Sequence, residues 1–211
     1  MDPSTSLVSP SPDPLGLAEL EDFYRWHARI YDWTRLLLLF GRKAAADAVM
    51  ARPGHLVLDV GCGTGVNLPR LAASGAAVVG IECTKAMRRL ALARVGRSPL
   101  AGRVQIDGRP YGTHSGYEGK ADGILFSYSL SMIPPFAAVL DRAKRDLRPG
   151  GRIVVVDFLE ARGPVAYGLG QSHVELGPER RLRLQRLFPE HRLEVVSVGL
   201  WRYFLFVGEV A

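Results

Sequence analysis

The stretch LVLDVGCGTGVN, residues 56–67, holds the first residues whose spacing points to chemistry. Glycine occupies every second position from Gly61 to Gly65, whereas a dinucleotide-binding turn is written G-x-G-x-x-G and a P-loop ends in Gly-Lys-Ser/Thr. The stretch matches neither fingerprint. We therefore expect a strand ending in Asp59, a turn that exposes bare backbone to a ligand, and a helix that opens near Asn67.

An acidic residue lies at the end of each of three expected strands: Asp59, Glu82 and Asp107. In an open parallel sheet, ligands bind outside the carboxyl ends of the strands, where Glu82 can accept both hydroxyls of a ribose. Asp107 or its neighbouring backbone can bond the exocyclic amine of a purine, and Asp59 can orient an ammonium group. A ligand with a purine, a ribose, an amino acid and no pyrophosphate fits this set, and S-adenosylmethionine is such a ligand.

The elements that must position these acids alternate along the chain. Strand-like runs lie at 56–60, 76–82, 103–107, 121–128 and 151–158, and helices are expected at 68–74, 84–95 and 136–147. This alternation predicts an α/β fold whose parallel sheet is covered by helices on both faces. Two more strand-like runs, at 192–198 and 201–210, are separated by two residues only, which predicts an antiparallel hairpin and a seven-stranded, mostly parallel sheet.

The beginning of the chain has a different character. Residues 1–16 are rich in Ser and Pro and lack the basic and apolar regions of a signal peptide, which favours a disordered leader. Residues 17–50 repeat apolar and aromatic side chains at three- and four-residue steps, as in a helical lid. We expect one domain over 17–211, with a sheet core at 55–211.

The bulk composition narrows the functional classes. A formal charge of +6 in 211 residues favours an acidic partner such as a phosphate head group, nucleic acid or an anionic substrate. Two cysteines are too few for a disulfide scaffold or a zinc site, so a reduced, cytoplasmic protein without metal is expected. No apolar run approaches the roughly 20 residues of a membrane-spanning helix.

Five segments in succession resemble the motifs of class I S-adenosylmethionine-dependent methyltransferases. They are LDVGCGTG, the acidic end of VVGIE, the ID at 106–107, FSYSLSMIPP and LRPGGRIVVVDF. The resemblance covers residues 56–158, and the terminal hairpin is similar to that family's sixth and seventh strands. It implies a Rossmann-like fold and S-adenosylmethionine as the cofactor.

The resemblance also implies individual roles. The methionine part of the cofactor would contact Asp59, Gly61, Gly63 and Gly65, together with Cys62 and Asn67 of the same loop, and the ribose would contact Glu82. Cys83, Met87, Asp107 and Gly108 would surround the adenine, Ser127 would lie beside the sulfonium, and Tyr24, Tyr31 and Arg42 would close over the cofactor.

A narrower resemblance concerns the methyl acceptor. Residues 23–42, 126–135, 155–158 and 172–177 are similar to bacterial N-methyltransferases that make betaine lipids from diacylglyceryl-homoserine, and phosphatidylethanolamine N-methyltransferases look less close. This resemblance implies a lipid head-group amine as the substrate. The alternative is a small soluble amine or another natural-product nucleophile.

Methyl transfer to nitrogen requires alignment of a neutral amine with the methyl group, and it demands no acid or base of special type. Our candidates for the acceptor side are Tyr128, Ser129, His173, Tyr167 and Tyr31. Aromatic faces from Tyr31 or Tyr128 can hold a methylated ammonium by cation–π attraction. A lone histidine such as His173 carries no spacing information, so an ordinary loop residue is the competing interpretation.

The segment ERRLRLQRLF at 179–188 places Arg180 and Arg183 near Leu184 and Leu187, as an interfacial helix would. Peripheral contact with an anionic membrane is one reading, and an ordinary solvated face is the other. A nucleic-acid enzyme is disfavoured because SYSLSMIPP lacks the Asn/Asp-Pro-Pro-aromatic pattern of enzymes that methylate base amines. A non-catalytic Rossmann-like binding module stays open, although its expected sign is a broken glycine loop and this loop is intact.

Overall fold

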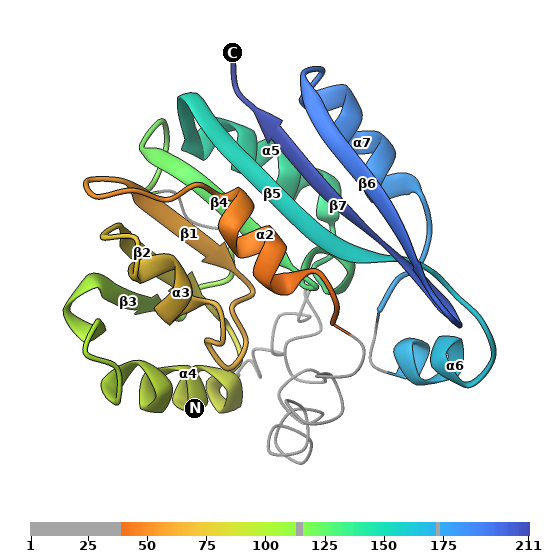
Figure 1. Cartoon of the computed structure of the whole chain (residues 1–211), viewed down its shortest axis with the longest axis horizontal. Coiled ribbons are helices and arrows are strands. Elements are labelled where there is room, and N and C mark those ends of the chain that lie inside the picture. The colour runs from red at the N-terminus through yellow and green to blue at the C-terminus, as the bar shows by residue number, and fades with distance from the viewer. Residues whose placement is uncertain (1–38, 113–115, 172–173) are drawn as a thin grey trace, which may run out of the picture.

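The computed structural model describes residues 39–112, 116–171 and 174–211. Its centre is one seven-stranded sheet with the order β3-β2-β1-β4-β5-β7-β6 (Figure 1). The expected leader, the lid as far as residue 38, and the site candidates Tyr24, Tyr31 and His173 lie outside the described residues. The division of the chain into leader, lid and core therefore stays a prediction.

Neighbouring strands from β3 to β5 pair in parallel, and β7 alone runs in the opposite direction, near one edge of the sheet. The parallel strands are β1 (Leu56–Val60), β2 (Ala77–Ile81), β3 (Val104–Asp107), β4 (Ala121–Ser127) and β5 (Leu147–Ala161). β7 (Trp201–Glu209) lies antiparallel between β5 and β6 (His191–Val198). This topology confirms the predicted fold class, including the C-terminal hairpin.

Helices cover both faces of the sheet (Figure 1). They are α2 (Arg42–Ala48), α3 (Leu68–Ala72), α4 (Lys85–Gly96), α5 (Phe136–Asp146), α6 (Gly163–Gln171) and α7 (Glu179–Leu187), with short 3₁₀ turns η1 (Ala101–Arg103) and η2 (Leu130–Met132). In Figure 1, α2 and α3 lie in front of the sheet, and α5 and α7 lie behind it.

The apolar run of β5 shows how the sequence builds two cores. Val154 and Val156 belong to the cluster that packs with α2 and α3, whereas Ile153 and Val155 belong to the cluster that packs with α5 and α7. Successive strand residues point to opposite faces, and all four are fully buried. A strand covered on both sides therefore reads as a continuous apolar run rather than an alternating one.

Several elements differ from the expected bounds, most of all β5, which spans Leu147–Ala161 where 151–158 was expected. β4 ends at Ser127, one residue early, because Tyr128 adopts a left-handed φ of 56° that no strand continues. α6 was not predicted, because Gly163, Gly168 and Gly170 lower the helix propensity of its nine residues. Among the described helices, none has the length and apolarity needed to span a bilayer.

Candidate active site

A cavity of about 230 Å³ opens at the carboxyl edge of the parallel strands. One side is formed by the glycine turn after β1 and by the end of β2. The rest of the lining comes from the segment after β3, from the loop after β4 and from α5. The lining residues that carry the argument are Gly63, Glu82, Tyr111, Tyr128, Ser129 and Met132. The cavity thus lies where a doubly wound sheet is expected to bind its ligand.

The glycine turn presents bare backbone to this cavity. Gly61 and Cys62 donate their backbone N–H groups to the carbonyl of Ile81, at 2.9 and 3.1 Å, which folds the turn against β2. Gly63 has φ +57°, and a Cβ at that position would meet nothing within 4 Å. A ligand can therefore lie directly against the peptide of Gly63, as predicted from its spacing.

Glu82 braces the turn from the end of β2. Its Oε2 accepts the backbone N–H of Gly63 at 2.9 Å, and its Oε1 accepts the N–H of Thr84 at 2.9 Å and the Thr84 hydroxyl. Burial raises the pKa of Glu82, and these hydrogen bonds oppose that rise. A carboxylate oxygen has two lone pairs, so Oε2 can accept a ribose hydroxyl in addition to Gly63.

Asp59 lies behind the turn and is fully buried. Neither of its carboxylate oxygens has a hydrogen-bond partner at ordinary distance among the described residues. Burial raises the pKa of Asp59 to about 7, while the Arg42 guanidinium and the Asn67 amide pull it back only in part. A buried, orphaned carboxylate is a group that the ammonium of an amino-acid ligand would satisfy, so Asp59 fits the expected cofactor.

Several other predicted site residues are not among those that line the cavity. Arg42 and Asn67 face Asp59, Cys62 is buried beside Gly63, and the buried hydroxyl of Ser127 has no hydrogen-bond partner within the described part of the chain. A Cβ on Gly65 would lie 3.2 Å from the Cα of Ala91 in α4. Gly65 therefore allows the turn to pack on that helix, and its predicted contact with the cofactor stays a prediction.

The tip of β4 supplies two of the predicted acceptor-side residues. Tyr128 lines the cavity, but its hydroxyl donates to the carbonyl of Phe40 at 2.6 Å, and its ring lies 4.6 Å from that of Phe158. Burial raises the pKa of Tyr128 far above its ordinary value, so the hydroxyl stays protonated. Ser129 also lines the cavity, and its hydroxyl donates to Val60 O at 2.6 Å. Both hydroxyls are therefore bonded to backbone carbonyls, and the two side chains form part of the cavity wall.

Tyr167, expected on the acceptor side, and Arg180, expected on a lipid-facing surface, have different surroundings in the structure. Tyr167 on α6 is 73% exposed and is not among the lining residues. Arg180, expected on a lipid-facing surface of α7, is 2% exposed, and its guanidinium donates to the Glu175 carbonyl. Arg183 pairs with Asp141 of α5 at 2.6 Å. These two arginines tie α7 to the core, and contact with an anionic membrane stays a prediction.

Sequence reasoning missed much of the apolar wall. The lining residues Tyr111, Met132, Ile133, Pro134, Pro135 and Val139 were not predicted, nor was Thr84. The run MIPP directly after the β4 tip was the available signal, since it continues the segment that carries Tyr128 and Ser129. Among the described residues, no group of three His, Cys, Asp or Glu side chains is arranged to hold a metal ion.

Comparison with solved structures supports the fold. The chain aligns with phosphoethanolamine N-methyltransferase 2 of Haemonchus contortus with a TM-score of 0.71 at 14% identity, over 89% of this chain and 59% of that one. It aligns with geranyl diphosphate C-methyltransferase from Streptomyces coelicolor with a TM-score of 0.68 at 14% identity, over 80% of this chain and 77% of that one. At these identities the likeness concerns the fold alone.

Sequence comparison identifies the family. The chain is 34% identical over 155 residues to a demethylmenaquinone methyltransferase of Tropheryma whipplei, which covers 71% of this chain and 63% of that protein. The chain thus spans less than two thirds of the length of this curated relative. Such relatives do not support the narrower resemblance to betaine-lipid N-methyltransferases. A family model described as a methyltransferase domain matches residues 25–208, so the chain belongs to the class I S-adenosylmethionine-dependent methyltransferases.

Proposed function

We propose that this protein transfers a methyl group from S-adenosylmethionine to a small, lipid-soluble acceptor of the quinol type. This proposal takes the small-molecule alternative in place of a lipid head-group amine. The name of the Tropheryma whipplei relative refers to a demethylated quinone, which supports an acceptor of this class. The lining of the cavity supports it independently.

The observation that carries the proposal is the uneven distribution of polar groups around the cavity. Glu82 and Thr84 follow β2, and Glu82 holds the glycine turn at Gly63, whereas the segment after β4 and α5 contribute Met132, Ile133 and Val139. Of the described lining residues, none is Lys, Arg or His. A head group that carries a phosphate or carboxylate needs a cationic partner when it leaves water, so this wall favours an uncharged, apolar acceptor.

The residues of the chain have three tasks in such a reaction. When bound, S-adenosylmethionine would supply an electrophilic methyl group on a sulfonium, and the acceptor would release one proton in exchange for it. Gly63 offers backbone for close approach, Glu82 offers a carboxylate to the ribose, and Asp59 offers one to the ammonium. The apolar wall excludes water and holds the acceptor in line, which is the main contribution an enzyme makes to methyl transfer.

The test is an assay with methyl-labelled S-adenosylmethionine on matched acceptor sets. One set contains reduced naphthoquinols without the ring methyl, another contains soluble amines, and a third contains vesicles with amine head groups. We expect label on a ring carbon of the quinol. Glu82→Ala serves as the cofactor-deficient background, and the exposed Glu160→Ala is its control. Label in the head groups alone would contradict the proposal, and label in a soluble amine alone would exclude the quinol.

A further inference from the structure

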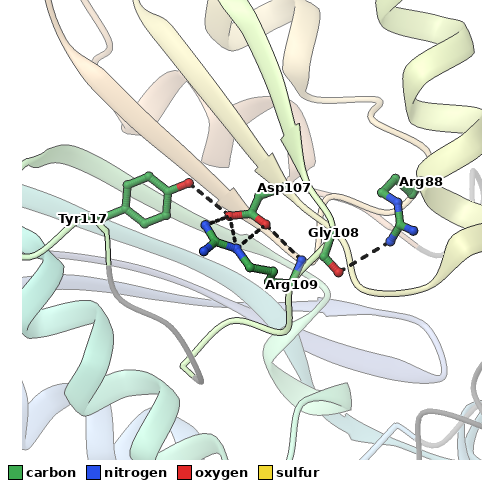
Figure 2. A network of polar contacts seen from close by, with 5 residues as sticks. All are labelled: Arg88, Asp107, Gly108, Arg109 and Tyr117. Atoms are coloured by element: carbon green, nitrogen blue, oxygen red, sulfur yellow. Dashed lines mark hydrogen bonds and ion pairs between the residues drawn. The ribbon is translucent and has the colours of Figure 1, made fainter.

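The carboxylate at the end of β3 already has its partners within the chain (Figure 2). Asp107 Oδ1 accepts the backbone N–H of Arg109 at 2.9 Å, and the two carboxylate oxygens accept Nε and Nη2 of the same arginine at 3.0 and 2.7 Å. The Tyr117 hydroxyl donates to Oδ2 at 3.3 Å. These donors fill the roughly four acceptor positions of a carboxylate.

Asp107 also lies away from the cavity, in agreement with a carboxylate whose acceptor positions are already filled. Neither Asp107 nor Gly108 is among the residues that line the cavity, whereas Pro110, Tyr111 and Gly112 are. In Figure 2 the carboxylate points toward Arg109 and Tyr117. The hydrogen bonds from Arg109 hold the pKa of Asp107 below its ordinary value, so the carboxylate stays ionised beside this arginine. Asp107 therefore contacts the loop that builds the wall rather than the space inside it.

A second arginine holds the neighbouring backbone. Nη1 of Arg88, on α4, donates to the carbonyls of Glu82 and Cys83 at 3.2 Å and to that of Gly108 at 3.5 Å. It thereby joins the end of β2 to the end of β3. A Cβ on Gly108 would lie 2.7 Å from this nitrogen, so the bridge depends on glycine at that position.

The far end of the same loop is also anchored. The hydroxyl of Tyr111 donates to Asp146 Oδ2 at 2.8 Å, and Nε of Arg142 donates to the other oxygen of Asp146 at 2.8 Å. The ring of Tyr111 packs edge-on against Phe126 at a centroid distance of 6.2 Å. Residues 108–112, which we call the β3 loop, are thus held at both ends by carboxylates that pair with arginines.

We propose that Asp107 is a positioning residue for the β3 loop and does not read the amino group of the cofactor's adenine. Arg109 and Arg88 fix the loop as a preformed wall, and the base is recognised by shape and by backbone groups. This inference rests on the proposed function, because it assumes that the cavity binds S-adenosylmethionine. It replaces the direct bond from the Asp107 carboxylate to a purine amine that the sequence suggested.

The test compares two ligands that differ at the base. S-adenosyl-L-homocysteine carries an amine where S-inosyl-L-homocysteine carries an oxygen, and calorimetry gives the affinity ratio for each protein variant. We expect Asp107→Asn to weaken both ligands together and to leave the ratio within about twofold of the wild-type value. If the carboxylate read the amine, its loss would reduce the preference for the adenosyl ligand by roughly tenfold or more. That result would overturn the inference.

Arg109→Gln keeps the inference testable if Asp107→Asn does not fold. Releasing Asp107 from Arg109 should loosen the wall and lower both affinities by a similar factor, about threefold to tenfold. A rise in affinity for the adenosyl ligand alone would show that Asp107 is a reader restrained by Arg109. Arg103→Gln is the matched control, because Arg103 directly precedes the first residue of β3 and its guanidinium donates to the carbonyl of Gly75.

Gly108→Ala tests the Arg88 bridge separately. Its Cβ should displace the guanidinium and weaken both ligands, whereas Gly102→Ala, where a Cβ meets open space, should weaken neither. Equal affinity of the wild type and Gly108→Ala for the two ligands would contradict the role of the Arg88 bridge in fixing the β3 loop. Failure of the wild-type protein to bind S-adenosyl-L-homocysteine would instead contradict the proposed function, so the two failures are distinguishable.

Discussion

Ser131 donates two hydrogen bonds to the buried carboxylate of Asp157, from its backbone N–H to Oδ2 at 2.8 Å and from its hydroxyl to Oδ1 at 2.7 Å. Asp157 lies in β5, and Ser131 lies in η2, one residue before the cavity-lining Met132. The carbonyl of Ser131 accepts the N–H of Glu175 at 3.1 Å. The carboxylate therefore fixes the segment after β4 that lines the cavity.

Asp157→Asn should disturb this segment, because the asparagine NH2 group would face one of the two Ser131 donors. That donor would lose its acceptor. We expect a loss of about 1–3 kcal/mol in the free energy of unfolding and a fall in kcat/KM for the acceptor. The affinity for S-adenosyl-L-homocysteine should change little. Asp141→Asn is the control, because Asp141 pairs with Arg183 outside the cavity. A selective loss of cofactor affinity would contradict the role assigned to Asp157.

The binding of the cofactor should depend on pH through Asp59. The pKa of this carboxyl, raised by burial from 3.8 to about 7, makes it neutral below neutral pH in the free protein. Its contribution to stability is present below about pH 4 and is lost as the pH rises through 7. Binding an ammonium needs the ionised form, so affinity should rise up to about tenfold per pH unit below pH 7 and then level off.

Asp59→Asn should flatten this dependence between pH 6 and 8, and calorimetry in buffers of different ionisation enthalpy will show whether a proton is released. Asp47→Asn is the control, because Asp47 is an exposed acid whose pKa is lowered by its hydrogen bond to Arg70. An unchanged pH profile in Asp59→Asn would remove the proposed contact with the ammonium.

Two glycines of the turn should respond differently to alanine. Gly63→Ala adds a Cβ to open space, so we expect a loss of about 1 kcal/mol from the left-handed φ and a fall in cofactor affinity of roughly tenfold. Gly61→Ala places a Cβ 2.5 Å from that of Ser129, so stability should fall more steeply. Denaturant unfolding and calorimetry separate the two effects. Wild-type affinity in Gly63→Ala would show that the ligand lies elsewhere.

Tyr128→Phe should preserve most of the methyl-transfer activity. The hydroxyl is protonated and donates to Phe40, so its removal costs about 1 kcal/mol of stability without removing an acid or base from the reaction. Tyr203→Phe, whose ring lies against Gly41 outside the cavity, is the matched control. A hundredfold fall in kcat that is specific to Tyr128→Phe would assign the hydroxyl a part in the chemistry.

The succession of strands and helices along the chain, the glycine turn and the acids at the strand ends were predictable from the sequence, because each follows from a local rule. Apolar runs such as Ile153–Val156 mark buried strands, and the carboxyl ends of parallel strands must meet at one edge. The spacing of Gly61, Gly63 and Gly65 then predicted a cofactor site beside the first strand. These features depend on a few neighbouring residues or on topology, which periodicity encodes.

The partners of charged groups were decided by the tertiary structure alone. Arg183 of α7 pairs with Asp141 of α5, the Tyr111 hydroxyl donates to Asp146, and Arg180, expected on the surface, is buried. The apolar wall brings Met132 and Tyr111 together from loops that follow different strands. Burial and the choice of partner depend on which distant segments pack together. A buried charge or hydroxyl stabilises the fold when it is paired and destabilises it when it is not, so the spacing of residues along the sequence cannot predict its contribution.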